Sequence, residues 1–131
     1  MPQVEAIEAF LRDAGCNAAS IQQLALVAEE ILANIMRDAW PGRAPGFCAV
    51  DVAATPGSDS IGVTLRTEDD GVAFDPLAAD PPDLELMLDE RPIGGLGILL
   101  IRTMTDTQTY HRTAGRNILE VRKQCPVARN D

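Results

Sequence analysis

The sequence has few aromatic and few basic side chains. Aromatic residues make up 4% of its 131 residues, and 20 acidic side chains outnumber 11 basic ones, which gives a formal net charge of −9. A charge of this sign repels the phosphate backbone of nucleic acids and anionic membrane surfaces. We therefore expect neither a nucleic acid nor a membrane as a partner.

Long apolar runs and cysteine motifs are absent as well. The longest apolar stretch, residues 96–101, is far shorter than the ~20 residues that a membrane-spanning helix needs, and the first residues lack the pattern of a secretory signal. We therefore expect a cytoplasmic protein. Cys16, Cys48 and Cys125 form no CxxC pair and no Cys/His cluster, which argues against a disulfide framework and a zinc site and favours reduced, structural thiols.

The single histidine gives no support for a catalytic triad. His111 falls in a predicted strand without a Ser or Cys motif near it, so we expect it at the surface. The acidic residues, in contrast, are concentrated, because nine of them lie in residues 68–90, where no Lys or Arg occurs. Their spacing does not match a calcium-binding EF-hand loop.

The length fits a single domain over residues 1–131. Apolar residues at helical spacing predict helices, and alternating or β-branched runs predict strands. The predicted helices cover residues 4–14, about 17–39 and 98–104, and the predicted strands cover 47–54, 60–67, 107–113 and 117–123. This order predicts an α+β fold, a two-layer α/β sandwich with helices packed on one face of a mixed, mostly antiparallel sheet.

The second predicted helix has two candidate N-caps and an apolar circumference. Either Asn17 or Ser20 could cap it, Ser20 together with Gln23 as a capping box. Leu26, Leu32 and Met36 lie away from the seam formed by its other apolar residues. A helix that is apolar on most sides is a buried one, so we expect little of its surface to meet solvent.

Glu30 and Asn34 lie one turn apart on the same side of this helix, whereas Glu29 lies about 140° from Asn34 around the helix axis. A carboxylate beside an amide oxygen can supply a general base and a ligand for Mg²⁺. The alternative is a solvated pair on the helix surface.

Two further motifs could bind parts of a ligand. The segment Asp-Asp-Gly-Val-Ala-Phe-Asp-Pro, residues 69–76, follows a predicted strand, where a carboxylate can accept a hydrogen bond from the amino group of a flat ring. The segment Gly-Gly-Leu-Gly, residues 94–97, opens a predicted helix, where free N–H groups and the helix dipole favour a phosphate. The alternatives are an acidic turn and a tight loop, and the glycine spacing matches neither a Rossmann nor a Walker A motif.

Taken in order, the three motifs resemble the N, G1 and G2 boxes of the GHKL ATP-binding superfamily. Within it, the segments Asp-x-Gly-x-x-Phe-Asp-Pro and Gly-Gly-Leu-Gly-Ile-x-Leu-Ile-Arg-x-Met-x-Asp, with the last hairpin, are similar to the stand-alone bacterial anti-sigma-factor serine/threonine protein kinases. The similarity runs from about residue 4 to residue 123. The family commonly has a strand before its first helix, and here the helix begins almost at Met1, so we expect that edge strand to be missing.

The resemblance implies a role for each motif. Glu30 would be the catalytic base that takes the proton from a serine hydroxyl, and Asn34 would give its amide oxygen to an Mg²⁺ ion bridging the phosphates of ATP. Asp69 would hold the adenine amino group, and Gly71 would give room for the ring. The other cofactor-binding positions that the resemblance implies are Ala73, Phe74, Arg91, Gly94, Gly95, Leu96 and Gly97, and residues 77–93 would form an ATP lid.

The resemblance also implies partners. The phosphate acceptor would be a serine of a STAS-domain anti-anti-sigma protein, the same surface could bind a sigma factor, and members of the family usually form homodimers. Ile93 stands where some active kinases place an arginine, and Arg91 is the nearest base before the glycines. The alternative function is a non-catalytic, nucleotide-dependent protein-binding module.

Overall fold

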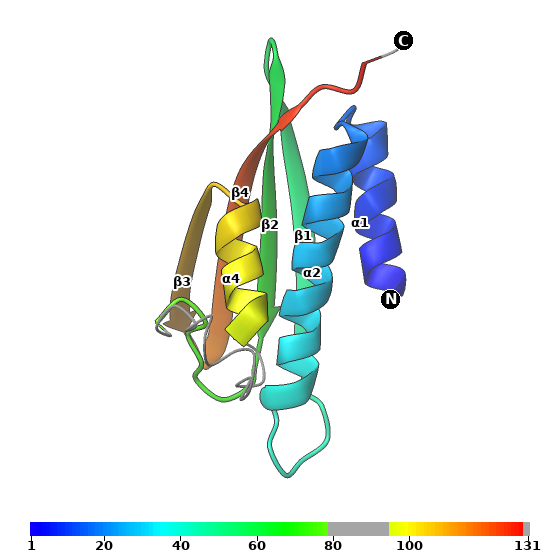
Figure 1. Ribbon diagram of the computed structural model, residues 1–131. Coiled ribbons are helices and arrows are strands. Elements are labelled where there is room, and N and C mark those ends of the chain that lie inside the picture. Colours follow the sequence, from blue (N-terminus) through cyan, green and yellow to red (C-terminus); the bar gives the residue numbers. More distant parts are fainter. Residues whose placement is uncertain (79–94, 130–131) are drawn as a thin grey trace.

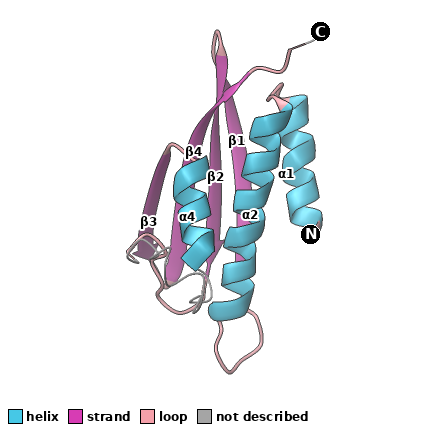
Figure 2. Ribbon diagram, in the orientation of Figure 1, coloured by secondary structure: helices cyan, strands magenta, loops and turns pink. Residues whose placement is uncertain are grey.

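The computed structural model describes residues 1–78 and 95–129, which fold into two layers (Figure 1). Its helices are α1 (Pro2–Asp13), α2 (Ala18–Asp38) and α4 (Gly95–Met104), and its strands are β1 (Cys48–Pro56), β2 (Ser60–Asp69), β3 (Thr107–Thr113) and β4 (Arg116–Pro126). The described strands form one sheet in the order β1-β2-β4-β3, and every neighbouring pair is antiparallel. The helices lie on one face of this sheet (Figure 2), which confirms the predicted α+β sandwich.

The junction between α1 and α2 shows which of the two candidate caps is used. Asn17 is the N-cap of α2, because its Oδ1 accepts a hydrogen bond from the N–H of Ser20 at 3.1 Å. The predicted capping box of Ser20 and Gln23 is therefore wrong, since Ser20 already lies in the first turn and is buried. Gly15 makes the preceding turn with a φ of +93°, a backbone conformation that favours glycine. Its carbonyl accepts from the N–H of Ala128, which ties the helix pair to the end of the sheet.

Strands β1, β2 and β4 are longer than the sequence pattern predicts, whereas β3 has the predicted bounds, and the strand register determines where the site residues lie. β2 continues two residues beyond Thr67 to Asp69, and there it is still paired on both sides, with Cys48 of β1 and Asn117 of β4. Directly opposed residues of antiparallel strands lie on the same face of a sheet. Asp69 and Asn117 therefore meet on the face that the helices cover.

The core fills the space between the helices and this inner face. Along β2, every second residue from Ile61 to Asp69 is buried and the residues between them are half-exposed, as the alternating sequence predicts. The largest fully buried side chains come from both layers: Leu11, Leu24, Leu65, Ile101, Val27, Val63, Val121 and Cys125.

The structure contradicts the expectation that α2 is buried on most of its sides. Leu32 is buried, but Leu26 is 39% exposed and Met36 is 54% exposed. The helices form a single layer over the sheet (Figure 1), so the side of α2 that faces away from the sheet meets solvent.

The cysteines and the histidine lie where the sequence predicts them. All three cysteines are free, and burial raises the pKa of the Cys16 thiol to about 11, which leaves it protonated and unreactive at neutral pH. His111 is exposed on β3. Among the described residues, no helix combines the length and the apolar character of a membrane span.

Candidate functional site

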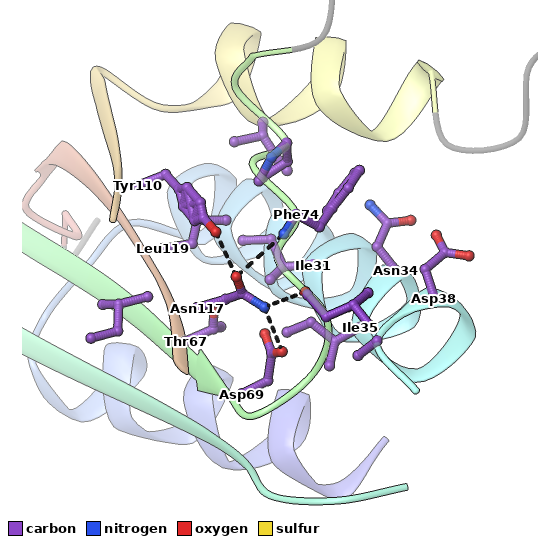
Figure 3. A pocket seen from close by; sticks show the side chains of 15 residues that line it. Ile31, Asn34, Ile35, Asp38, Thr67, Asp69, Phe74, Tyr110, Asn117 and Leu119 are labelled. Atoms are coloured by element: carbon purple, nitrogen blue, oxygen red, sulfur yellow. Dashed lines mark hydrogen bonds between the residues drawn. The ribbon is translucent and has the colours of Figure 1, made fainter. Parts of the chain in front are cut away.

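A pocket opens between α2, the loop that follows β2, and the strands β3 and β4 (Figure 3). Its volume is about 540 Å³, open solvent at its mouth included. Most of its lining is apolar, which is typical of small-molecule sites, and its polar side chains are Asn34, Asp38, Thr67, Asp69, Tyr110 and Asn117. The pocket thus joins two predicted site residues from distant parts of the sequence, Asn34 of α2 and Asp69 of β2.

Asp69 contributes a buried carboxylate to the lining of this pocket. The side chain is 5% exposed, and its Oδ1 accepts hydrogen bonds from the N–H of Gly71 at 2.9 Å and from Nδ2 of Asn117 at 3.0 Å. No described residue donates to its Oδ2. Asp69 lines the pocket, so among the described residues this oxygen is an acceptor that no donor occupies. The open oxygen can take a hydrogen bond from an amino group of a ligand.

Gly71 is needed for a contact inside the protein. A Cβ at this position would overlap the Cβ of Ala39 and lie 2.6 Å from its carbonyl oxygen. The same carbonyl accepts a hydrogen bond from the N–H of Val72 at 2.9 Å. The glycine therefore lets the loop after β2 rest on the C-terminal end of α2, which holds Asp69 beside that helix.

Glu30 and Asn34 meet the start of α4. A Cβ at Gly97 would lie 2.7 Å from Oε2 of Glu30 and 3.4 Å from Nδ2 of Asn34. The absence of a side chain at Gly97 thus allows the first turn of α4 to approach both groups. Glu30 lies beside this contact rather than in the pocket lining, while Asn34 takes part in both. The structure thus brings residues of the predicted motifs on α2 and α4 together.

Arg37 belongs to this neighbourhood, and the sequence reasoning missed it. Its Nη2 donates to Oδ1 of Asn34 at 3.1 Å, and its guanidinium forms a salt bridge with Asp38 at 2.8 Å. The hydrogen bond to Asp38 raises the pKa of Arg37 and lowers the pKa of Asp38. The signal in the sequence was a basic residue three positions after Asn34, on the same helix face.

Asp70 has a structural role that separates it from Asp69. Its Oδ1 accepts from the indole N–H of Trp40 at 2.8 Å and from the N–H of Phe47 at 2.9 Å. The hydrogen bond from Trp40, followed by the one from Phe47, lowers the pKa of Asp70. The two neighbouring carboxylates therefore have different roles. Asp70 holds the loop between α2 and β1 by hydrogen bonds, and Asp69 lines the pocket.

Asn117 is the second residue that the sequence reasoning missed. It is 8% exposed, lines the pocket and donates to Asp69. Figure 3 shows it between Tyr110 and Asp69, with hydrogen bonds on both sides. Its position opposite Asp69 follows from strand register, which the motif comparison did not use.

The remaining predicted positions divide into described and undescribed residues. Ala73 and Phe74 lie in the loop after β2, where Phe74 lines the pocket and is 49% exposed. Gly95 and Leu96 begin α4. Arg91, Gly94 and residues 79–93 of the predicted lid lie outside the described residues. The first residue assigned to the lid, Leu77, packs against the core, and its carbonyl accepts a hydrogen bond from Arg102.

Comparison of the sequence with known proteins identifies the family of this chain. Residues 3–123 match the family described as the histidine kinase-like ATPase domain. A serine/threonine-protein kinase of Bordetella bronchiseptica, BtrW, is 33% identical over 96 residues, which cover 73% of this chain and 65% of that protein. The matched region thus spans less than two thirds of that relative.

The chain belongs to the histidine kinase-like ATPase domain family, whose model matches nearly all of it. The fold and the family match confirm the predicted GHKL type, and the relative BtrW is by name a serine/threonine-protein kinase. A histidine kinase-like ATPase domain is therefore the class of protein that the fold and the family match define.

Proposed function

We propose that this protein is an Mg-ATP-dependent serine/threonine protein kinase of the anti-sigma-factor type. It would transfer the γ-phosphate of ATP to a serine of a STAS-domain anti-anti-sigma protein and so regulate a sigma factor or another effector. One observation carries the proposal: the carboxylate of Asp69 and the amide of Asn34 line one pocket, and Glu30 lies beside Asn34 at Gly97.

In this proposal, the positions of the polar groups determine the orientation of the bound nucleotide. An adenine amino group would donate to Oδ2 of Asp69, with the ring between the apolar side chains of the lining. The phosphates would then extend toward Asn34, Arg37 and the N-terminal end of α4. Free N–H groups and the positive end of the helix dipole favour anions there.

The residues present suit a magnesium ion held together with phosphates. Among the described residues no cluster of three or more His, Cys, Asp or Glu side chains could hold a metal by itself. Mg²⁺ at nucleotide sites commonly takes one or two protein oxygens and completes its shell with phosphates and water. The amide oxygen of Asn34 would be such a ligand. When bound, the ion would neutralise charge that develops on the phosphates.

The chemistry assigned to the side chains is a phosphoryl transfer. Glu30 would accept the proton of the serine hydroxyl, and the serine oxygen would form a bond to the γ-phosphorus as the bond to the β,γ-bridging oxygen breaks. The products are phosphoserine and ADP, and the proton rests on Glu30 until it passes to solvent. Arg37 would contribute positive charge beside the phosphates.

Nucleotide binding is tested by thermal unfolding with and without Mg-ATP. A ligand at ~100 times its dissociation constant stabilises the folded state by about 2.7 kcal/mol, which raises the midpoint of a domain of this size by several degrees. We expect this shift in the parent protein and its loss in Asn34→Ala. An equal shift in both proteins would contradict the role of Asn34, and no shift in either would overturn nucleotide binding.

Phosphoryl transfer is tested with Glu30→Gln and its neighbour Glu29→Gln. Glu29 is exposed on another side of α2, so the pair matches the change of charge while only Glu30 lies beside Gly97. Candidate STAS-domain proteins are incubated with Mg-ATP and each variant, and phosphoserine is measured by mass spectrometry. We expect transfer by the parent protein and Glu29→Gln and a fall of about 10²-fold or more in Glu30→Gln.

The rival function and the assembly state are separated by two further measurements. Nucleotide-dependent capture of a STAS-domain protein without phosphoserine would favour the non-catalytic binding module. Light scattering of the purified chain tests the predicted homodimer, and a monomeric mass at working concentration would contradict it.

A further inference from the structure

We propose that Asn117 is a positioning residue that fixes the orientation of Asp69 and so makes the pocket selective for adenine, with its 6-amino group, over guanine, with a carbonyl at that position. This inference rests on the proposed nucleotide-binding function. In this role Asn117, which also lines the pocket, acts through the carboxylate of Asp69.

The hydrogen bonds of Asn117 leave its amide only one orientation. Its Oδ1 accepts from the N–H of Phe74 at 3.3 Å and from Nη1 of Arg112 at 2.9 Å, and both groups can only donate. Its Nδ2 donates to the carbonyl of Val72 at 2.8 Å and to Oδ1 of Asp69 at 3.0 Å, and both groups can only accept. Exchange of the amide oxygen and nitrogen would therefore break all four bonds.

A fifth bond connects Asn117 to β3. The hydroxyl of Tyr110 lies 2.5 Å from Oδ1 of Asn117, and Arg112 of the same strand also donates from Nη1 to the carbonyl of Gly71 at 3.1 Å. The amide thus joins the ends of β2 and β3 to the loop over residues 71–74. A buried polar side chain with every group satisfied holds its neighbours in a single arrangement.

The consequence for Asp69 is that its two oxygens differ. Asn117 and the N–H of Gly71 both donate to Oδ1, so Oδ2 is the acceptor left for a ligand. Adenine presents an amino group at its six position, whereas guanine presents a carbonyl oxygen there. A carboxylate oxygen held at a fixed point accepts a hydrogen bond from the adenine amino group and repels the guanine carbonyl oxygen. A carboxylate that is free to rotate would discriminate less between the two bases.

The test compares Asn117→Asp with Gln124→Glu on the same strand. Both substitutions change an amide to a carboxylate, and Gln124 is exposed with only its acceptor oxygen bonded, to Ser60. The Asn117→Asp substitution would keep the acceptor for Tyr110 and Arg112 but would replace the donor to Asp69 with an oxygen. The dissociation constants of ATP and GTP are measured by calorimetry with Mg²⁺ for each protein, and unfolding midpoints are measured without nucleotide.

We expect Asn117→Asp to lower the ratio of ATP to GTP affinity about tenfold or more, because a lost hydrogen bond beside a charged group commonly has this size. Gln124→Glu should leave the ratio unchanged. A lower unfolding midpoint with an unchanged ratio would overturn the inference, since a merely structural residue produces that result. A parent protein that binds neither nucleotide would overturn the proposed function itself.

A second variant covers the case in which Asn117→Asp does not fold. Tyr110→Phe removes only the hydroxyl that donates to Asn117 and keeps the ring. We expect the same direction of change in the ratio of ATP to GTP affinity, by about two- to fivefold, since one of three donors to Oδ1 is lost. An unchanged ratio in this variant would contradict the proposed connection between β3 and Asp69.

Discussion

Arg37 donates from Nη2 to Oδ1 of Asn34 at 3.1 Å, one turn back along α2. This is the oxygen that we assign to Mg²⁺, so the guanidinium and the cation cannot both approach it closely. An incoming phosphate offers the guanidinium a stronger acceptor. We therefore expect Arg37 to turn from Asn34 to the phosphates when Mg-ATP binds.

Replacing Arg37 with Ala should weaken binding of ATP much more than binding of adenosine. A hydrogen bond to a charged group contributes about 1.5–3 kcal/mol, which corresponds to about tenfold or more in affinity. Adenosine has no phosphate and should be affected little. Arg12→Ala, an exposed charge on α1, is the matched control, and calorimetry measures each dissociation constant.

The opposite result would identify a different role for Arg37. Tighter binding of Mg-ATP by Arg37→Ala would mean that the guanidinium competes with the cation for Asn34. Equal loss of affinity for ATP and adenosine would mean that it only supports the folded site.

Gly97→Ala should lower the rate of phosphoryl transfer without lowering the stability of the fold. The new Cβ would lie 2.7 Å from Oε2 of Glu30, the end of a flexible side chain that can move away. Alanine in a helix is about 1 kcal/mol more favourable than glycine, so the unfolding midpoint should stay the same or rise. Phosphoryl transfer should fall about tenfold or more because Glu30 is displaced. Thr103→Ala, on an exposed position of the same helix, is the control, and transfer unchanged in Gly97→Ala would contradict the role of Glu30.

The sequence predicts the fold because its signals are local. Alternation along β2 and helical spacing along α2 each identify an element from a few neighbouring residues. The same alternation explains why Asp69 faces the helices and Asp70 does not. Boundaries are predicted less well, because β2 extends beyond Thr67 through pairing with β1 and β4.

The site residues that were missed depend on contacts between distant segments. Asn117 meets Asp69 only because β2 and β4, which are distant in the sequence, pair in the register that places the two residues opposite each other. The contact of Gly71 with Ala39 likewise joins a loop to the end of α2. A motif comparison assigns residues to boxes, whereas these relationships arise from strand pairing and layer packing.

Gly71→Ala should destabilise the fold, whatever the state of the nucleotide site. Its Cβ would meet the Cβ and the backbone oxygen of Ala39, and backbone atoms cannot yield as a side-chain end can. Overpacking of this kind costs about 1–3 kcal/mol, which lowers the unfolding midpoint by about 5–10 °C in a domain of this size. Gly62→Ala is the control, because its Cβ would meet the end of the Gln124 side chain at 3.2 Å. Equal midpoints for the two variants would contradict the packing assigned to Gly71.

Asp70→Asn should make the protein less sensitive to acid. The hydrogen bonds from Trp40 and Phe47 lower the pKa of Asp70 below its ordinary value of 3.8. A carboxyl whose folded-state pKa is lowered stabilises the fold above its unfolded-state pKa, and the contribution is lost as pH falls through the folded-state value. Asparagine keeps an acceptor oxygen without a charge. The gap in unfolding midpoint between parent and variant should therefore be largest near neutral pH and should shrink from about pH 4 downward. Asp59→Asn, in the exposed turn before β2, is the charge-matched control. If the difference in unfolding midpoint between the parent and Asp70→Asn stays constant down to acid pH, the ionised carboxylate adds no stability at this position.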